Sequence, residues 1–444
     1  MACEPRPKLF PLWRSVKGES AVKVQGESAN PESRQILDFV VDGRQPPVTA
    51  ELVGTRNSIK RRPQFIFHPF CRKIKRHTGP RRSSLNVQAQ SPPGLMGADH
   101  KQSRGVAHDP LRIGADHLEN GIAELGGRSL LPNRGIPLNL DWVENVRVNT
   151  SAVERRAQSH VARRTVKKDW QAAWLLRVIS CMDLTTLSGD DTEERVKRLC
   201  AKARHPLRQD LVEKLEIADL NITAAAACVY HAFVETALHS LEGTRVRVAA
   251  VSTGFPAGLS PLAERVAEIR RSVEVGAHEI DVVITRAHVF GGRWQALYDE
   301  VAAFKQACGR AHMKVILGTG DLLTLRNVAR ASAVAMMAGA DFIKTSTGKE
   351  STNATLPVGL VMVRAIREYA QQTGMAVGFK PAGGIRTAKQ SLDWLSMMKE
   401  ELGDSWLRAE MFRFGASTLL NDIERQLEHH ATGRYSAEYR HPMA

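Results

Sequence analysis

Apolar runs and amphipathic stretches alternate along the last two thirds of the chain. The apolar runs predict strands over residues 177–183, 222–230, 246–252, 279–284, 313–318, 342–346, 377–381 and 412–416. Between them, apolar positions recur with helical spacing. This spacing predicts helices over 191–203, 231–242, 261–276, 294–308, 322–338, 357–373, 388–402 and 417–431, after an amphipathic helix over 153–176.

Eight strand–helix units predict an α/β fold of the (β/α)8 TIM-barrel type, with an N-terminal helix in front of it. The strand segments are apolar throughout rather than alternating, as expected when both faces of a parallel sheet are covered. A doubly wound open sheet would show the same alternation and is the competing fold. In a barrel, active-site residues lie at the C-terminal ends of the strands.

The first 136 residues have a different composition. They hold 13 of the 20 prolines and +10 of the formal net charge of +15, and no helical or strand period is sustained. We therefore predict a mostly disordered basic extension over 1–136 and a barrel domain over 137–444. The basic stretch at 60–82 has two interpretations, a nuclear-localisation or RNA-binding patch, or a solvated tail without a selected role.

Other sequence features narrow the class of protein. The chain contains no apolar run of the roughly 18 residues that a membrane span needs, and its N-terminus lacks the apolar segment of a signal peptide. The six cysteines are scattered and include no C-x-x-C pair. This pattern favours reduced thiols in a cytoplasmic protein, with nuclear presence left open by the basic stretch. No His, Asp or Glu cluster has metal-ligand spacing, so we expect neither a metal nor a cofactor.

Charged residues stand in or at the end of several predicted strands. Asp183 ends the first, Asp281 lies in the fourth, Lys344 in the sixth and Lys380 in the seventh. Burying an unpaired charge is strongly unfavourable, so these residues need either partners or a chemical purpose.

The functional interpretation of the two lysines is amine catalysis. A lysine pKa is normally about 10.4, but a second cation nearby and partial desolvation favour the neutral amine. A neutral lysine attacks aldehydes and ketones to give a Schiff base, which is the chemistry of a metal-free aldolase. Asp281 could then exchange protons with a water at the substrate carbon. The alternative is a buried ion pair in the barrel mouth with no chemistry.

Glycine-containing segments follow three of the predicted strands: TSTGKE at 345–350, PAGGIR at 381–386 and FGAST at 414–418. Glycines let backbone amides approach an anion, and helix N-termini favour negative charge. Lys349 and Arg386 would add positive charge. Because barrel enzymes often bind phosphate after the seventh and eighth strands, these segments predict a phosphate site.

Five segments together resemble the deoxyribose-phosphate aldolase family in its animal form. They are FIKTSTGKE (342–350), GFKPAGGIR (378–386), EIDVVI (279–284), DLTTLSGDDT (183–192) and FRFGAST (412–418), and the resemblance extends over about 138–444. It implies a metal-independent class I aldolase on a (β/α)8 barrel. Such an enzyme cleaves 2-deoxy-D-ribose 5-phosphate reversibly to D-glyceraldehyde 3-phosphate and acetaldehyde, in deoxyribonucleotide and carbohydrate catabolism.

The resemblance also implies roles for individual residues. Lys344 would form the Schiff base, Lys380 would be the second active-site lysine, Asp281 the proton donor and Asp183 a supporting acid. Residues of the phosphate-binding loops would be Gly348, Lys349, Gly383, Gly384, Gly415 and Ser417, joined by Arg386 on the basis of its charge. Cys228 matches a cysteine near the family's site, and we expect no catalytic role for it.

Two features depart from the family pattern. Asp321 stands where a glutamate is expected, and the front extension has no counterpart. Two other functions stay open, an aldolase of different sugar specificity and a nucleic-acid-binding role for 1–136. The expected partner is a phosphosugar rather than a membrane or a nucleic acid, and a homo-oligomer is left open.

Overall fold

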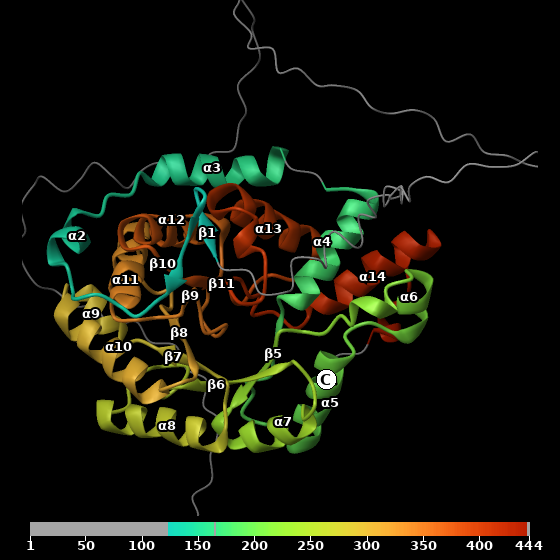
Figure 1. Ribbon diagram of the computed structural model, residues 1–444, viewed down its shortest axis with the longest axis horizontal. Coiled ribbons are helices and arrows are strands. Elements are labelled where there is room, and N and C mark those ends of the chain that lie inside the picture. The colour runs from blue at the N-terminus through green and yellow to red at the C-terminus, as the bar shows by residue number, and fades with distance from the viewer. Residues whose placement is uncertain (1–122, 164–165, 442–444) are drawn as a thin grey trace, which may run out of the picture. The chain divides into compact units, whose positions relative to one another are not determined.

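The computed structural model describes residues 123–163 and 166–441 (Figure 1). The basic stretch at 60–82 and most of the predicted extension lie outside these residues. Among the described helices, none is long and apolar enough to cross a bilayer.

A parallel sheet forms the centre of the described structure. Its strands pair in chain order, apart from the short β10 that belongs to another sheet, and they are β4 (Asp183–Thr185), β5 (Ala226–Tyr230), β6 (Arg247–Ser252), β7 (Glu279–Val283), β8 (His312–Ile316), β9 (Phe342–Lys344) and β11 (Gly378–Lys380). All neighbouring pairs in this sheet are parallel.

Residues 412–415 close the sheet into a barrel. Phe412 forms a parallel bridge with Phe379 in β11, and Phe414 forms one with Met182, directly before β4. Backbone hydrogen bonds run along both sides: the Arg413 amide donates to the Phe379 carbonyl, and the Asp183 amide donates to the Phe414 carbonyl. The predicted (β/α)8 barrel is therefore confirmed, although its eighth strand is reduced to single bridges.

Helices surround this barrel in Figure 1. They are α5 (Glu193–Arg204), α7 (Val234–Ser240), α8 (Leu262–Val275), α10 (Trp294–Cys308), α11 (Leu325–Met337), α12 (Leu356–Thr373), α13 (Ala388–Leu402) and α14 (Leu419–Thr432). Helix α3 (Thr150–Arg163) lies across α12 and α13 (Figure 1). The apolar core fills the layer between the strands and these helices.

Local sequence signals explain several helix ends. Thr387 and Gln390 form a capping box in front of α13, which satisfies amides that the first turn leaves unpaired. Gly276 ends α8 with a φ of 114°, a left-handed conformation that glycine adopts without steric penalty. These ends agree closely with the predicted ranges.

Two predictions at the front of the barrel are wrong. The run 177–183 begins inside helix α4 (Lys168–Ser180), and the first strand starts at Asp183 instead of ending there. A short apolar run cannot by itself distinguish a strand from the buried face of a helix. The single helix predicted over 153–176 is two helices, α3 and α4, and Lys168 at the start of α4 has a φ of 57°.

Short elements lie outside the predicted pattern. They are the helices α2 (Leu140–Asn145), α6 (Gln209–Lys214) and α9 (Arg286–Phe290), and the strands β1 (Glu124–Leu125), β2 (Arg128–Ser129), β3 (Leu131–Pro132) and β10 (Met375–Ala376). β3 pairs with β10, and buried Asn133 donates its side-chain amide to the carbonyls of Met336 and Ala340. The described structure thus begins before the predicted boundary at residue 137.

Successive side chains along each strand point alternately towards the surrounding helices and into the barrel. Ile280, Val282, Ile343 and Phe379 belong to the apolar core beneath the helices. Asp281, Lys344 and Lys380 occupy the alternate positions, which point into the barrel. The inward positions therefore carry the charges, and the strand ends bring them to the C-terminal side.

Candidate active site

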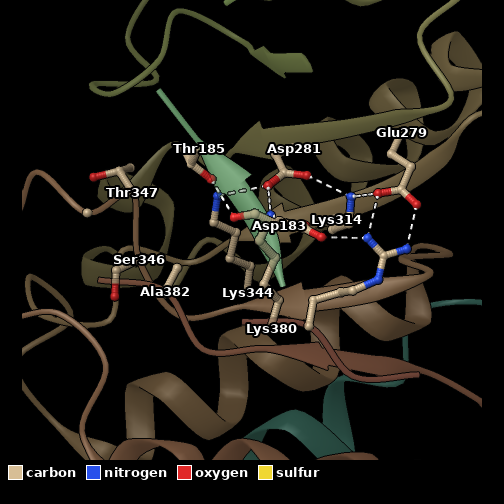
Figure 2. Close-up of polar contacts among 12 residues, drawn as sticks. Asp183, Thr185, Glu279, Asp281, Lys314, Lys344, Ser346, Thr347, Lys380 and Ala382 are labelled. Atoms are coloured by element: carbon tan, nitrogen blue, oxygen red, sulfur yellow. Dashed lines mark hydrogen bonds and ion pairs between the residues drawn. The ribbon is translucent and has the colours of Figure 1, made fainter. Parts of the chain in front are cut away.

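Lys344 and Lys380 are direct neighbours on adjacent strands. They are register partners in the pairing of β9 with β11. Both Nζ atoms lie 2.8 Å from the same oxygen, Oδ2 of Asp281 (Figure 2). The structure thus brings together the three residues that the sequence analysis placed on separate strands.

Asp183 joins this group from β4. Its Oδ2 lies 2.6 Å from Nζ of Lys380, so Lys380 is held between two carboxylates while Lys344 contacts one of them (Figure 2). Lys380 and both aspartates are fully buried, and Lys344 is 3% exposed. The amine of Lys344 is therefore the member of the group that is nearest to solvent.

The environments of the two lysines move their pKa values in opposite directions. Burial lowers the pKa of Lys344, and the positive charge of Lys380 lowers it further, against the pull of Asp281. Burial alone would also lower the pKa of Lys380, but Asp183 and Asp281 together raise it above the usual lysine range. Lys344 is thus the amine that gives up its proton more easily.

Asp281 stays a carboxylate in this setting. Burial by itself would raise its pKa, but the charges of Lys314, Lys344 and Lys380 outweigh that effect and hold the pKa well below the usual range. An ionised Asp281 can accept a proton from a bound water or hydroxyl group.

A cavity of 350 Å³ opens above Lys344 at the C-terminal side of the barrel. Loops after β4, β9, β11 and the closing segment line it, and its lining includes all seven predicted phosphate-binding residues: Gly348, Lys349, Gly383, Gly384, Arg386, Gly415 and Ser417. A larger cavity of 620 Å³ between the α2–α3 segment and helices α11 and α12 contains none of these residues. The smaller cavity is therefore the candidate active site.

Some polar groups of these loops already form hydrogen bonds within the protein. The Ser417 hydroxyl accepts the Thr185 amide at 2.7 Å and lies 2.9 Å from the Thr185 carbonyl. The Gly348 amide donates to Glu350 at 3.1 Å. By contrast, the side chains of Lys349 and Arg386 are exposed at the cavity. An anion entering here would meet two exposed cations.

Three charged residues of the barrel interior were missed by the sequence analysis. Lys314 lies 3.0 Å from Oδ1 of Asp281 and also contacts Glu279, while Arg413 contacts Asp183 and Glu279 at 2.6 and 2.7 Å. These residues could have been found by the feature that identified Lys344, which is a charged residue within an apolar strand segment. Lys314 stands in MKVILG, Arg413 between two phenylalanines, and Glu279 two positions before Asp281.

Two further predicted positions lie outside the polar group. Oδ2 of Asp321, in the loop after β8, pairs with Nε of Arg286 at the start of α9 at 3.3 Å, and Asp321 is absent from the cavity lining. Cys228 is fully buried in β5, where burial raises the pKa of its thiol. Within the described ranges, no group of three or more His, Cys, Asp or Glu side chains is placed to hold a metal ion.

The fold and these side chains are typical of barrel enzymes that act on carbonyl compounds through a lysine. Comparison with known proteins agrees. The family of DeoC/LacD family aldolases matches residues 177–425, which is more than half of the chain. The chain belongs to this family.

Individual relatives extend the similarity beyond residues 177–425. The chain is 59% identical to the deoxyribose-phosphate aldolase of Homo sapiens over 314 residues, covering 70% of this chain and 99% of that protein. It is 60% identical to that of Mus musculus over 313 residues, covering 70% and 98%. The crystal structure of a putative deoxyribose-phosphate aldolase from Toxoplasma gondii ME49 matches with a TM-score of 0.50 and 21% identity, covering 60% of this chain and 96% of that one. This structural match supports the fold.

Proposed function

We propose that this protein is a deoxyribose-phosphate aldolase. It would cleave 2-deoxy-D-ribose 5-phosphate reversibly to D-glyceraldehyde 3-phosphate and acetaldehyde. The observation that carries the proposal is the pair Lys344 and Lys380 on one oxygen of Asp281, beneath a cavity with cations at its rim. The similarity to curated deoxyribose-phosphate aldolases supports this choice of substrate.

The reaction begins with the neutral amine of Lys344. It attacks the C1 aldehyde of the open-chain sugar, and loss of water leaves a protonated imine. Lys380 is charged between its two carboxylates when the substrate arrives, so it disfavours an ammonium ion at Lys344. It can then donate a proton to the hydroxyl group of the carbinolamine, which leaves as water, and it regains a proton from solvent.

Cleavage then breaks the bond between C2 and C3. The Asp281 carboxylate, acting through a water, removes the proton of the C3 hydroxyl, and the electrons of the C2–C3 bond move towards the imine nitrogen. D-glyceraldehyde 3-phosphate leaves, and an enamine of acetaldehyde stays on Lys344. Protonation at C2 and hydrolysis of the resulting imine release acetaldehyde and restore the amine.

The phosphate end of the substrate fits the rim of the cavity. Lys349 and Arg386 supply positive charge there, and Gly383 and Gly384 present backbone at left-handed φ angles of 76° and 81°. Charge-assisted hydrogen bonds from such groups hold phosphate strongly. The distance from Lys344 to this rim would set the chain length of the sugar that reacts.

Reductive trapping tests the proposal directly. Acetaldehyde with cyanoborohydride should leave an ethyl group on Lys344, found by mass spectrometry of the digested protein. The Lys344→Arg variant keeps a cation but cannot form the imine, so it should show neither label nor cleavage of deoxyribose 5-phosphate. Label on Lys380 with Lys344 unmodified would overturn the assignment of the nucleophile.

A second set of assays separates the alternatives that remain. Cleavage of other phosphorylated sugars in preference to deoxyribose 5-phosphate would keep the mechanism and change the substrate. Salt-sensitive RNA binding by the full chain, lost in a 123–444 fragment, would support a nucleic-acid role for the basic extension. The fragment should start at 123 rather than 137, because Asn133 is buried against the carbonyls of Met336 and Ala340.

A further inference from the structure

A closed ring of ion pairs lies inside the barrel beneath Lys344. Asp281 contacts Lys314, Lys314 contacts Glu279, Glu279 contacts Arg413, Arg413 contacts Asp183, Asp183 contacts Lys380, and Lys380 returns to Asp281. Cations and carboxylates alternate around the ring. All six residues are 3% exposed or less, so water screens their charges little.

The charges within the ring balance, whereas Lys344 is an additional charge beside it. The ring contains three cations and three carboxylates, which balance one another. The exposed side chain of Arg247 also reaches Glu279 from outside the ring, at 3.8 Å. Lys344 is attached to the ring from outside, through a single carboxylate oxygen that already accepts Lys380. Within the described part of the chain, the buried cluster thus provides Lys344 with no carboxylate of its own.

We propose that Lys314 and Glu279 are positioning residues which, by keeping the ring neutral, determine how readily Lys344 gives up its proton. The inference rests on the proposed function, because it concerns the amine that forms the imine. Lys314 acts through Asp281: it occupies Oδ1 at 3.0 Å while Lys344 sits on Oδ2 at 2.8 Å. Glu279 acts one step further away, by holding Lys314.

The proposal predicts opposite effects for two single variants. Lys314→Met leaves three carboxylates and two cations in the ring, so Asp281 becomes the counter-ion of Lys344 and the amine keeps its proton to higher pH. Glu279→Gln leaves three cations and two carboxylates, so Lys344 loses its proton at lower pH. The double variant Lys314→Met/Glu279→Gln restores the balance and should return towards the wild-type behaviour.

The test measures the pH dependence of imine formation at Lys344 in the full-length protein. Trapping with acetaldehyde and cyanoborohydride is followed by mass spectrometry from pH 5 to 10. We expect the midpoint to move up by about one pH unit in Lys314→Met, equal to about tenfold less trapping on the acid side, and down by a similar amount in Glu279→Gln. The double variant should lie within about half a unit of the wild type.

Controls keep the outcomes distinct. Lys399→Met removes a lysine from an exposed pair with Asp404 and should leave the midpoint unchanged. Thermal unfolding of each variant shows whether the barrel still folds, and if one single variant fails to fold, the balanced double variant and the other single variant still give a comparison. A folded Lys314→Met or Glu279→Gln with a wild-type midpoint would overturn the inference. An absence of trapping in the wild type would instead overturn the proposed function.

Discussion

Lys380 contacts two carboxylates, whereas its neighbour Lys344 contacts one, and that one is shared with Lys380. Burial lowers the pKa of Lys344, whereas the two carboxylates raise the pKa of Lys380 despite burial. Lys380 is thus a fully paired cation, and Lys344 is a desolvated amine that shares its one carboxylate. Variants of the two positions should therefore behave differently in stability even where both lose activity.

Replacing Lys344 with Met should abolish cleavage and stabilise the fold by about 1 kcal/mol at pH 7. Because burial lowers its pKa, the folded state binds this proton less tightly than the unfolded state does. The sign follows from linkage: the wild type gains stability as pH rises from the folded pKa towards 10.5, the ordinary lysine value. The advantage of Lys344→Met should shrink over the same range. Urea unfolding at pH 7 and pH 10 measures it, and a variant less stable than the wild type at pH 7 would contradict the argument.

Replacing Lys380 with Met should destabilise the protein. Asp183 and Asp281 would each lose a partner at 2.6 and 2.8 Å in a fully buried site. Breaking a buried pair from one side typically costs about 3–5 kcal/mol. Urea unfolding beside Lys344→Met provides the matched comparison. Equal stabilities for the two variants would show that Lys380 is not the paired cation of this site.

Acid should weaken the fold through the three interior carboxylates. The pKa values of Asp183, Glu279 and Asp281 are all held below their ordinary values by the surrounding cations, despite burial, which acts in the opposite direction. Their stabilisation is therefore complete above pH 5 and is lost as pH falls through the ordinary values of about 4 towards the folded ones. Each group contributes up to about 1.4 kcal/mol per pH unit in that window.

Urea unfolding between pH 7 and pH 3 follows this loss. Asp281→Asn removes one titrating group, so its unfolding free energy should change less steeply below pH 5 than that of the wild type. Asp404→Asn, in an exposed pair, serves as the control and should keep the wild-type slope. An Asp281→Asn slope equal to the wild-type slope would mean that this carboxylate titrates alike in both states.

Lys349 and Arg386 should affect only the binding of the phosphate group of the substrate. Lys349→Met and Arg386→Met each remove one exposed charge at the cavity, in the loops five residues after Lys344 and six residues after Lys380. A lost hydrogen bond to a charged group corresponds to about 1.5–3 kcal/mol, so KM for deoxyribose 5-phosphate should rise about tenfold or more. Cleavage of unphosphorylated 2-deoxyribose should be unchanged. A parallel loss with both sugars would place these cations in the chemistry or the fold.

The sequence predicts the barrel and the proposed reactive residues, but it does not predict the contacts among them. Lys344, Lys380 and Asp281 are detectable because a charge inside an apolar strand is conspicuous, and strand order then places them together. The run at 177–183 misleads, because Val178 and Ile179 are as apolar on the buried face of α4 as they would be in a strand. Which oxygen each amine shares depends on side-chain geometry between strands, and no single segment encodes it.

The closed ring of ion pairs is a second example of contacts that the sequence alone does not predict. Lys314 and Arg413 are each a charge within an apolar strand segment, as Lys344 is. They are separated by about a hundred residues, and both contact Glu279. Their relation follows from barrel closure at 412–415, which pairs the last segment with the residues on either side of it. The sequence analysis identified Asp183, Asp281 and Lys380 but missed Lys314, Glu279 and Arg413, and only the closed barrel shows how the six residues are connected.

A substitution at Gly415 tests how tightly the barrel is packed where residues 412–415 close it. A Cβ at this position would lie 2.8 Å from Cβ of Ala382 and 3.2 Å from Cε of Lys380, so Gly415→Ala should push the lysine away from Asp281. We expect a loss of about 1–3 kcal/mol in unfolding free energy, as for overpacking elsewhere, together with at least about tenfold lower activity. Gly189→Ala is the matched control, because a Cβ there would meet no atom within 4 Å. Thermal unfolding and the cleavage assay on both variants decide the point, and a fully active, fully stable Gly415→Ala would show that Lys380 does not depend on this contact.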